Sequence, residues 1–265
     1  MYNRATRNET HPDRKGNIVK PKKQLLFAAG VGMLASTFQC LAQQAAPPQY
    51  RVVITHLKPD MLSEWIDLQK NEVVPALKKA GQATRTVYST TLFGNSYEYV
   101  TVTPFAKYAD FDAGNMLVKA LGQTANNRLQ EKLRKCVVST QSYAITRLTD
   151  ISNVLDGPPA PMQVNVRYRI AAGKMQDFEN LFKSEILPVY KKAKVGVVVS
   201  RRGAGANPND VTVGTQYSKF ADMDGGTFLT KQLGAEGAAK VNAKFNGIRT
   251  TIEVVVRTRV ADLSF

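Results

Sequence analysis

Two stretches of the chain show the same succession of hydrophobic patterns. Apolar and polar positions alternate over residues 50–57 and 163–171, where β-branched side chains are frequent, and this predicts strands. Apolar side chains then recur every three or four positions over 60–80 and 174–193, which predicts helices. The same reasoning predicts strands at 84–92, 97–104, 137–148, 195–202, 210–217 and 249–261, and helices at 116–134 and 228–246. The order β-α-β-β-α-β, which is that of a ferredoxin-like unit, therefore occurs twice.

A near-constant offset relates the two stretches. The segment Glu-Val-Val-Pro-Ala-Leu-Lys-Lys-Ala at 72–80 lies 113 positions before Glu-Ile-Leu-Pro-Val-Tyr-Lys-Lys-Ala at 185–193. Residues 107–114 and 219–226 match again at an offset of 112. A single offset that persists over about a hundred residues indicates an internal duplication.

The N-terminal segment has the composition of a targeting signal. A basic stretch ends at Lys22-Lys23, an apolar run covers 25–38, and small residues follow from Ala42. This is the order of a secretory signal peptide, and the apolar run is short for a membrane span. We expect cleavage and export to the periplasm or the exterior, with no membrane association afterwards; a retained anchor or lipidation is the alternative. The predicted parts of the chain are a signal peptide at 1–42, a linker at 43–48, a repeat at 49–152, a Pro-rich linker at 153–161 and a second repeat at 162–265.

Charge and cysteine content limit the kinds of partner and of cross-link. The formal net charge is +15, and it remains +10 without residues 1–42. This balance favours anionic partners. Basic residues form no run beyond pairs such as Lys78-Lys79, so we expect no nucleic-acid partner. Cleavage would remove Cys40 and leave Cys136 alone, as a buried apolar side chain with no disulfide.

These motifs resemble those of a known superfamily. The first strand, a long helix with Glu-x-x-Pro-x-x-Lys-Lys, a hairpin and a Lys-Tyr/Phe-Ala-Asp segment are similar to the dimeric α/β-barrel superfamily, and within it to the NIPSNAP-like branch. The resemblance covers 49–265. It implies an α+β fold in which two ferredoxin-like sheets pair into one barrel with helices outside, here as a pseudo-dimer of tandem repeats. Apolar runs such as 52–54 and 254–256 agree with closure, which hides both faces and all edges of the strands.

Period-two alternation assigns one face of each strand to the barrel interior. We expect Val53, Thr55, Leu57 and their counterparts Val166, Tyr168 and Ile170 to lie under the helices, together with Ile252, Val254 and Val256. The opposite face holds Val52, Ile54 and His56 in the first repeat. The ligand-binding residues predicted on this face are Arg147, Arg167, Arg169, Arg257, Arg259, Asn165, Gln141 and Tyr143, with Glu253 as the carboxylate among them.

The excess of guanidinium groups in this set points to an anion. Buried charges are costly unless paired, and guanidinium groups bind carboxylates and phosphates with matching geometry. A small anionic ligand would balance the charge of such an interior. In the alternative interpretation, the arginines lie near the strand ends, reach water and only solubilise the mouth of the barrel.

The sequence offers few groups for catalysis. His56 is the one histidine beyond residue 42, and as a base it would need an orienting carboxylate, for which Glu253 is the candidate; a structural histidine is the alternative. We expect no metal site, because no second histidine or thiolate pair is present to complete one. Haem-handling members of the superfamily use a helical histidine, which the predicted helices lack, so we expect no cofactor. Cofactor-free monooxygenase members combine polar groups with Trp or His inside the barrel, whereas Trp65 is predicted to lie on a packing face.

Three hypotheses about function follow. The first is an exported protein that binds a small anionic molecule inside the barrel. The second is a cofactor-independent monooxygenase or isomerase that uses His56 with Glu253. The third is a structural or interaction protein with a filled interior. Whether the chain is an enzyme and whether it forms a homo-oligomer stay open at this level.

Overall fold

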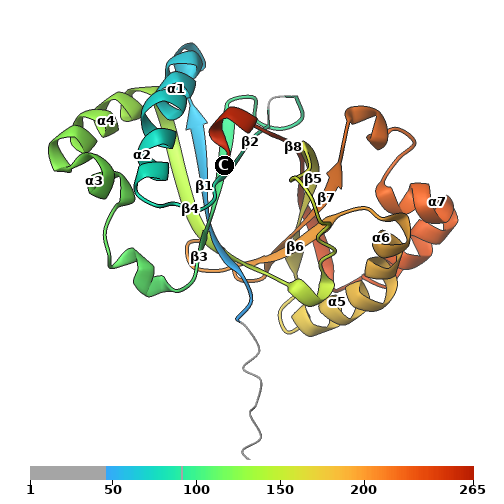
Figure 1. Ribbon diagram of the computed structural model, residues 1–265. Coiled ribbons are helices and arrows are strands. Elements are labelled where there is room, and N and C mark those ends of the chain that lie inside the picture. Colours follow the sequence, from blue (N-terminus) through green and yellow to red (C-terminus); the bar gives the residue numbers. More distant parts are fainter. Residues whose placement is uncertain (1–45, 91) are drawn as a thin grey trace, which may run out of the picture. The chain divides into compact units, whose positions relative to one another are not determined.

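Strands and helices follow one another in the order that the hydrophobic pattern predicts. The computed structural model describes residues 46–90 and 92–265 (Figure 1). The predicted signal peptide at 1–42 lies outside these residues, as does Cys40. Cys136 is buried, as expected, and has no disulfide partner among the described residues.

The strands of the described region close into one antiparallel barrel. Their order around it is β1-β3-β2-β8-β5-β7-β6-β4. The bounds are β1 Gln49–Leu57, β2 Thr86–Ser89, β3 Glu98–Phe105, β4 Val137–Arg147, β5 Met162–Ile170, β6 Val197–Arg202, β7 Asp210–Tyr217 and β8 Arg249–Arg259. The fold is therefore α+β with an eight-stranded closed barrel, and no sheet edge of this barrel is left unpaired.

Two runs of four strands meet at two short seams. Strands β4-β1-β3-β2 come from residues 49–152, and β8-β5-β7-β6 come from 162–265. The seams are β2 with β8, where Tyr88 pairs with Arg259, and β4 with β6, where Ile145 pairs with Arg202. The segment after β4 also bonds to β6, and the last residues bond back to the chain just before β2. Each half thus extends across the seam onto the other.

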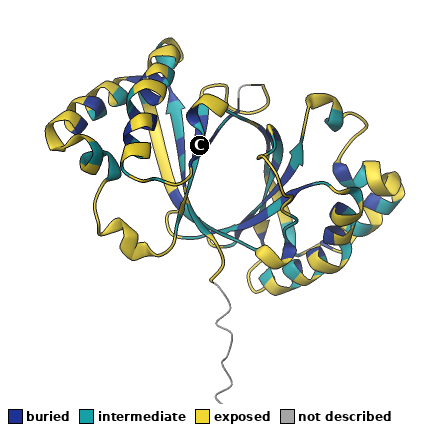
Figure 2. Cartoon of the chain, in the orientation of Figure 1, coloured by how far each residue is buried: buried dark blue, intermediate teal, exposed yellow. Residues whose placement is uncertain are grey.

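Helices cover the outside of the barrel and bury their inner faces (Figure 2). They are α1 Leu62–Leu68, α2 Val74–Lys79, α3 Met116–Leu121, α4 Gln123–Cys136, α5 Met175–Leu181, α6 Leu187–Ala193 and α7 Phe228–Ala243. One apolar cluster forms under α1–α4 around Trp65, and another under α5–α7 around Phe178. Since both clusters lie outside the strands, the barrel interior is a separate environment.

The long predicted helices are interrupted rather than ended. Pro75 and Pro188 fall late in them, where proline kinks or ends a helix, yet helical structure continues to Lys79 and Ala193. A π-helical turn precedes each proline, at 69–73 and 182–186. Proline cannot donate a backbone hydrogen bond, and its ring crowds the carbonyl of the residue four positions earlier. The wider π-helical turn occurs in the residues just before each proline, where this lost hydrogen bond would otherwise fall.

The outer face of β8 corrects one prediction about packing. Val256 is buried, but Ile252 is 43% exposed and Val254 is 59% exposed. The apolar cluster under α5–α7 contains residues of β5, β6 and β7 and none of β8. Because β8 lies at the seam with β2, most of its outer face is not covered by these helices.

Candidate functional site

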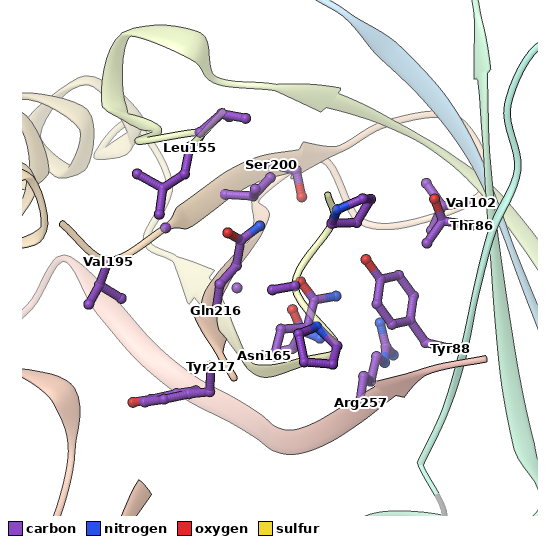
Figure 3. A pocket seen from close by; sticks show the side chains of 18 of the residues that line it. Thr86, Tyr88, Val102, Leu155, Asn165, Val195, Ser200, Gln216, Tyr217 and Arg257 are labelled. Carbon is purple, nitrogen blue, oxygen red and sulfur yellow. The ribbon is translucent and has the colours of Figure 1, made fainter. Parts of the chain in front are cut away.

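The barrel interior holds a cavity of about 850 Å³ at the end where β1 begins and β4 ends (Figure 3). Residues 154–161, called the strap below, line this end of the cavity. The strap is held on one side by the bridge between Asn153 and Val197, and on the other by the Arg259 amide, which donates to the Pro161 carbonyl at 2.7 Å. The predicted Pro-rich linker thus forms part of the site.

One wall of the cavity is apolar. It comes from β1, β3 and β4, whose inward side chains include Val52, Val100, Val102 and Ile145. Tyr143 lies beside them and is buried, with its ring 4.5 Å from the Arg202 guanidinium. Strand alternation brings these residues to one face, as predicted for Val52 and Tyr143.

The opposite wall is polar and comes from β5, β6 and β7. Gln163 and Gln216 lie directly opposite each other in the β5–β7 ladder, and Asn165 lies opposite Gly214. Ser200 and Thr212 continue this wall deeper into the barrel. The wall is therefore built from neutral hydrogen-bonding groups.

Three arginines, Arg147, Arg257 and Arg259, lie near enough to Tyr88 to act on its hydroxyl electrostatically. Burial raises the pKa of the Tyr88 hydroxyl, and the positive charges of Arg259, Arg257 and Arg147 act against that rise. The Nε atoms of all three arginines are buried and lack a hydrogen-bond partner within the described residues. The Arg147 guanidinium also lies 4.8 Å from the Tyr50 ring centroid. This part of the interior is therefore positively charged, and it contains N–H donors that lack hydrogen-bond acceptors within the described residues.

Carboxylates at the far end of the barrel neutralise other predicted site residues. Arg167 bonds Asp210 at 3.3 Å and Glu253 at 3.2 Å, and Arg169 also bonds Asp210. Neither arginine lines the cavity. The prediction that Glu253 is the carboxylate of this interior is wrong as to number, because Asp210 and Glu98 face inward as well.

His56 has a different carboxylate partner from the predicted one. Its Nε2 lies 3.1 Å from Glu98 Oε2, and its Nδ1 lies 3.0 Å from Ser139 Oγ. The other oxygen of Glu98 lies 3.5 Å from Arg257 Nη2. The cross-strand register of β1 and β3, which places His56 opposite Glu98, explains the difference. His56 itself does not line the cavity; Glu98, its partner, pairs with Arg257, which does line it.

The structure brings half of the predicted ligand-binding set to the cavity. Arg147, Arg257, Asn165 and Tyr143 line it. Gln141 is exposed and does not line the cavity, and neither does Arg259, which pairs with Tyr88 across the β2–β8 seam. Tyr88, Gln163, Gln216 and the strap line the cavity as well and are not among the predicted residues. Alternation in β2 and β7, to which no inward face had been assigned, would have identified the two strand positions Tyr88 and Gln216.

The described residues, 46–90 and 92–265, offer neither a metal-binding cluster nor a membrane-spanning helix. No group of three or more His, Cys, Asp or Glu side chains that could hold a metal ion occurs among them. Within the same residues, no helix has both the length and the apolarity needed to cross a membrane.

Comparisons with known proteins identify the fold. No protein-family model matches the chain, and no curated protein matches it in sequence. A proposed monooxygenase from Lactobacillus acidophilus NCFM superposes with a TM-score of 0.54 at 9% identity, covering 82% of this chain and 95% of that one. A proposed monooxygenase from Fusobacterium nucleatum subsp. nucleatum ATCC 25586 gives 0.54 at 10% identity, covering 81% and 93%. An anthrone oxidase-like protein gives 0.54 at 12% identity, covering 81% and 92%. The chain has the dimeric α/β-barrel fold that these structures share.

Proposed function

We propose that the barrel cavity binds a small organic anion with a largely apolar body. The observation that carries this proposal is the group of three guanidiniums around Tyr88, each with a buried Nε that has no partner within the described residues. Among the described residues, Glu98 is the one carboxylate that forms an ion pair with any of these three arginines. The set therefore retains an excess of positive charge that a ligand carboxylate or phosphate would neutralise.

The size and lining of the cavity agree with this class of ligand. Small-molecule sites usually enclose about 300–1,000 Å³ and combine apolar walls with a few polar groups, and this cavity measures about 850 Å³. The hypothesis of a filled barrel does not describe such an interior. A guanidinium fork that meets a carboxylate in a poorly hydrated space forms stronger hydrogen bonds than the same pair in water.

The test compares an anion with a neutral molecule of the same shape. We expect 2-naphthoate to bind more tightly than 2-naphthamide in titration calorimetry, and Arg147→Gln and Arg257→Gln to weaken 2-naphthoate binding by about tenfold each. Arg128→Gln, an exposed position on α4, is the matched control and should have no effect. A parent protein that responds to no one- or two-ring carboxylate and to no inorganic phosphate would disprove the proposal.

A second candidate is cofactor-independent monooxygenation or isomerisation of such a ligand. The resemblance in fold to two proposed monooxygenases and an anthrone oxidase-like protein favours it, and so does the His56–Glu98 pair behind Arg257. In an oxygenation of this kind, one atom of O₂ would become a carbonyl oxygen on a methylene carbon of the ligand, and the other would leave as water with the two methylene hydrogens. Oxygen consumption with added anthrone, lost in Glu98→Gln and His56→Gln, would support it; no uptake by the parent would count against it.

Export and duplication complete the proposal. We infer that residues 1–42 are a cleaved signal peptide and that the two halves arose by tandem duplication, with the NIPSNAP-like branch as the nearest resemblance. The offset of 112–113 residues and the identical strand order in both halves support the duplication. N-terminal sequencing of the protein recovered from the periplasm or medium tests the export.

A further inference from the structure

Three carboxamides lie together on the polar wall of the cavity. Gln163 and Asn165 come from β5, and Gln216 comes from β7. Figure 3 shows Asn165 and Gln216 directed into the same space. Asn165 is 6% exposed, and its Nδ2 has no hydrogen-bond partner within the described residues. No other group of neutral amides faces the apolar wall of this cavity in the described part of the chain.

Two glycines leave room for these carboxamides. A Cβ added at Gly214 would lie 2.7 Å from Asn165 Oδ1 and 3.1 Å from Gln163 Oε1. At Gly196, a Cβ would lie 1.9 Å from Gln216 Oε1. Both distances to Asn165 and Gln216 are below any ordinary van der Waals contact, so alanine at either position would displace a carboxamide. Because Gly196 and Gly214 have no side chain, the carboxamides can lie close to the backbone at these two positions.

A carboxamide can both donate and accept, and it carries no net charge. A row of such groups suits hydroxyl and carbonyl oxygens rather than a second charged group. The opposite wall, with Val52 and Val102, suits the face or edge of an apolar ring. A site whose buried polar groups need partners discriminates strongly against ligands that lack them.

We propose that the ligand is a ring compound that carries, besides its anionic group, a hydroxyl or carbonyl on the edge that meets Gln163, Asn165 and Gln216. Gly196 and Gly214 then act as specificity-determining positions, because they fix where the amides lie. This inference rests on the proposed anion-binding function and specifies its ligand class.

The test measures a preference rather than an affinity alone. The probes are 6-hydroxy-2-naphthoate and 6-methyl-2-naphthoate, which share the anionic group and nearly the same size. We expect the parent to bind the hydroxyl compound about tenfold more tightly in titration calorimetry, a difference of one buried hydrogen bond. Asn165→Leu, or Gln216→Leu if that variant folds better, should reduce the preference, measured as the ratio of the two affinities on the same variant, to below about twofold.

Two further variants separate this inference from the function on which it rests. Gly214→Ala should reduce the preference in the same way as Asn165→Leu, whereas Arg147→Gln should weaken both probes equally. Gln176→Leu, an exposed carboxamide on α5, should change nothing. Equal binding of both probes by the parent, or a preference that survives in both Asn165→Leu and Gln216→Leu, would overturn the inference alone. Failure of both naphthoates to bind would overturn the anion site as well.

Discussion

The two halves of the barrel are alike on the outside and different on the inside. On the outside of the barrel, Trp65 of α1 and Phe178 of α5 occupy corresponding positions, offset by 113, and both are buried and apolar. Inside the barrel, the same offset pairs Val52 with Asn165. Three more pairs of corresponding residues, at an offset of 112, line the cavity with unlike side chains: Val100 with Thr212, Tyr88 with Ser200, and Ile145 with Arg257.

This contrast separates what the fold requires from what the site requires. The outer face of each sheet must bury an apolar surface against helices, whichever half it belongs to. The inner face meets a cavity, so its side chains are not constrained by close packing in the same way. An apolar wall and an amide wall therefore coexist in one barrel without loss of the shared architecture.

The largest expected effect tests the equivalence of the outer faces. Trp65→Ala and Phe178→Ala should each destabilise the chain by about 4 kcal/mol, since both remove a large buried aromatic side chain. Urea unfolding of the two variants measures this. A difference above about 2 kcal/mol between them would show that one half supports the fold more than the other.

The next largest effect on stability is expected when an inward residue of the first half is replaced by its counterpart from the second half. Val52 is 3% exposed on the apolar wall, and Val52→Asn should lower the free energy of unfolding by about 3 kcal/mol because its amide would lack partners there. Val52→Ala serves as the control for lost volume. If Val52→Asn is no worse than Val52→Ala, the apolar wall is wetter than its lining indicates.

A buried polar pair in the first half provides a third comparison. The Arg85 guanidinium donates to Gln69 Oε1 at 2.7 Å, and the corresponding residues of the second half are Phe182 and Val197. Gln69→Leu should destabilise the chain by about 2 kcal/mol, because it removes a hydrogen bond from a buried cation. The double variant Gln69→Phe/Arg85→Val should recover much of that loss, as apolar replacements of buried charged groups often do.

The same pair predicts a pH dependence. Burial lowers the pKa of Arg85 to about 10, so the folded chain holds this proton less tightly than the unfolded chain does. The buried charge therefore destabilises the fold at neutral pH, and this penalty falls as the pH rises above about 10. Between pH 8 and pH 10.5 the urea midpoint of the parent should rise relative to that of the double variant, which lacks Arg85; an unchanged difference between the two midpoints would contradict the assignment.

The smallest effect is a stabilisation. Asn165→Leu should raise the free energy of unfolding of the unliganded protein by about 1 kcal/mol, because it removes a buried amide nitrogen that has no partner within the described residues. Thermal melting without added ligand measures this. A loss of stability instead would mean that water already satisfies the amide in the free cavity.

Alternation and repetition predicted the strands, the helices and the inward faces of β1, β5 and β8. These are local properties, read along one segment at a time, and they placed Val52, Asn165 and Arg257 correctly. The partners of charged residues could not be predicted in the same way. His56 meets Glu98 because of the register between β1 and β3, and Arg167 meets Asp210 through the register between β5 and β7. The strap lines the cavity only because distant strands hold both of its ends.

The strap also has a genetic consequence. A barrel assembled from two copies of one chain repeats every substitution on both sides of its symmetry axis. Here a single polypeptide spans both sides, so asparagine at 165 does not bring asparagine to position 52. Each wall can change by one codon at a time, as in a heterodimer, and the two sides never have to find each other in solution.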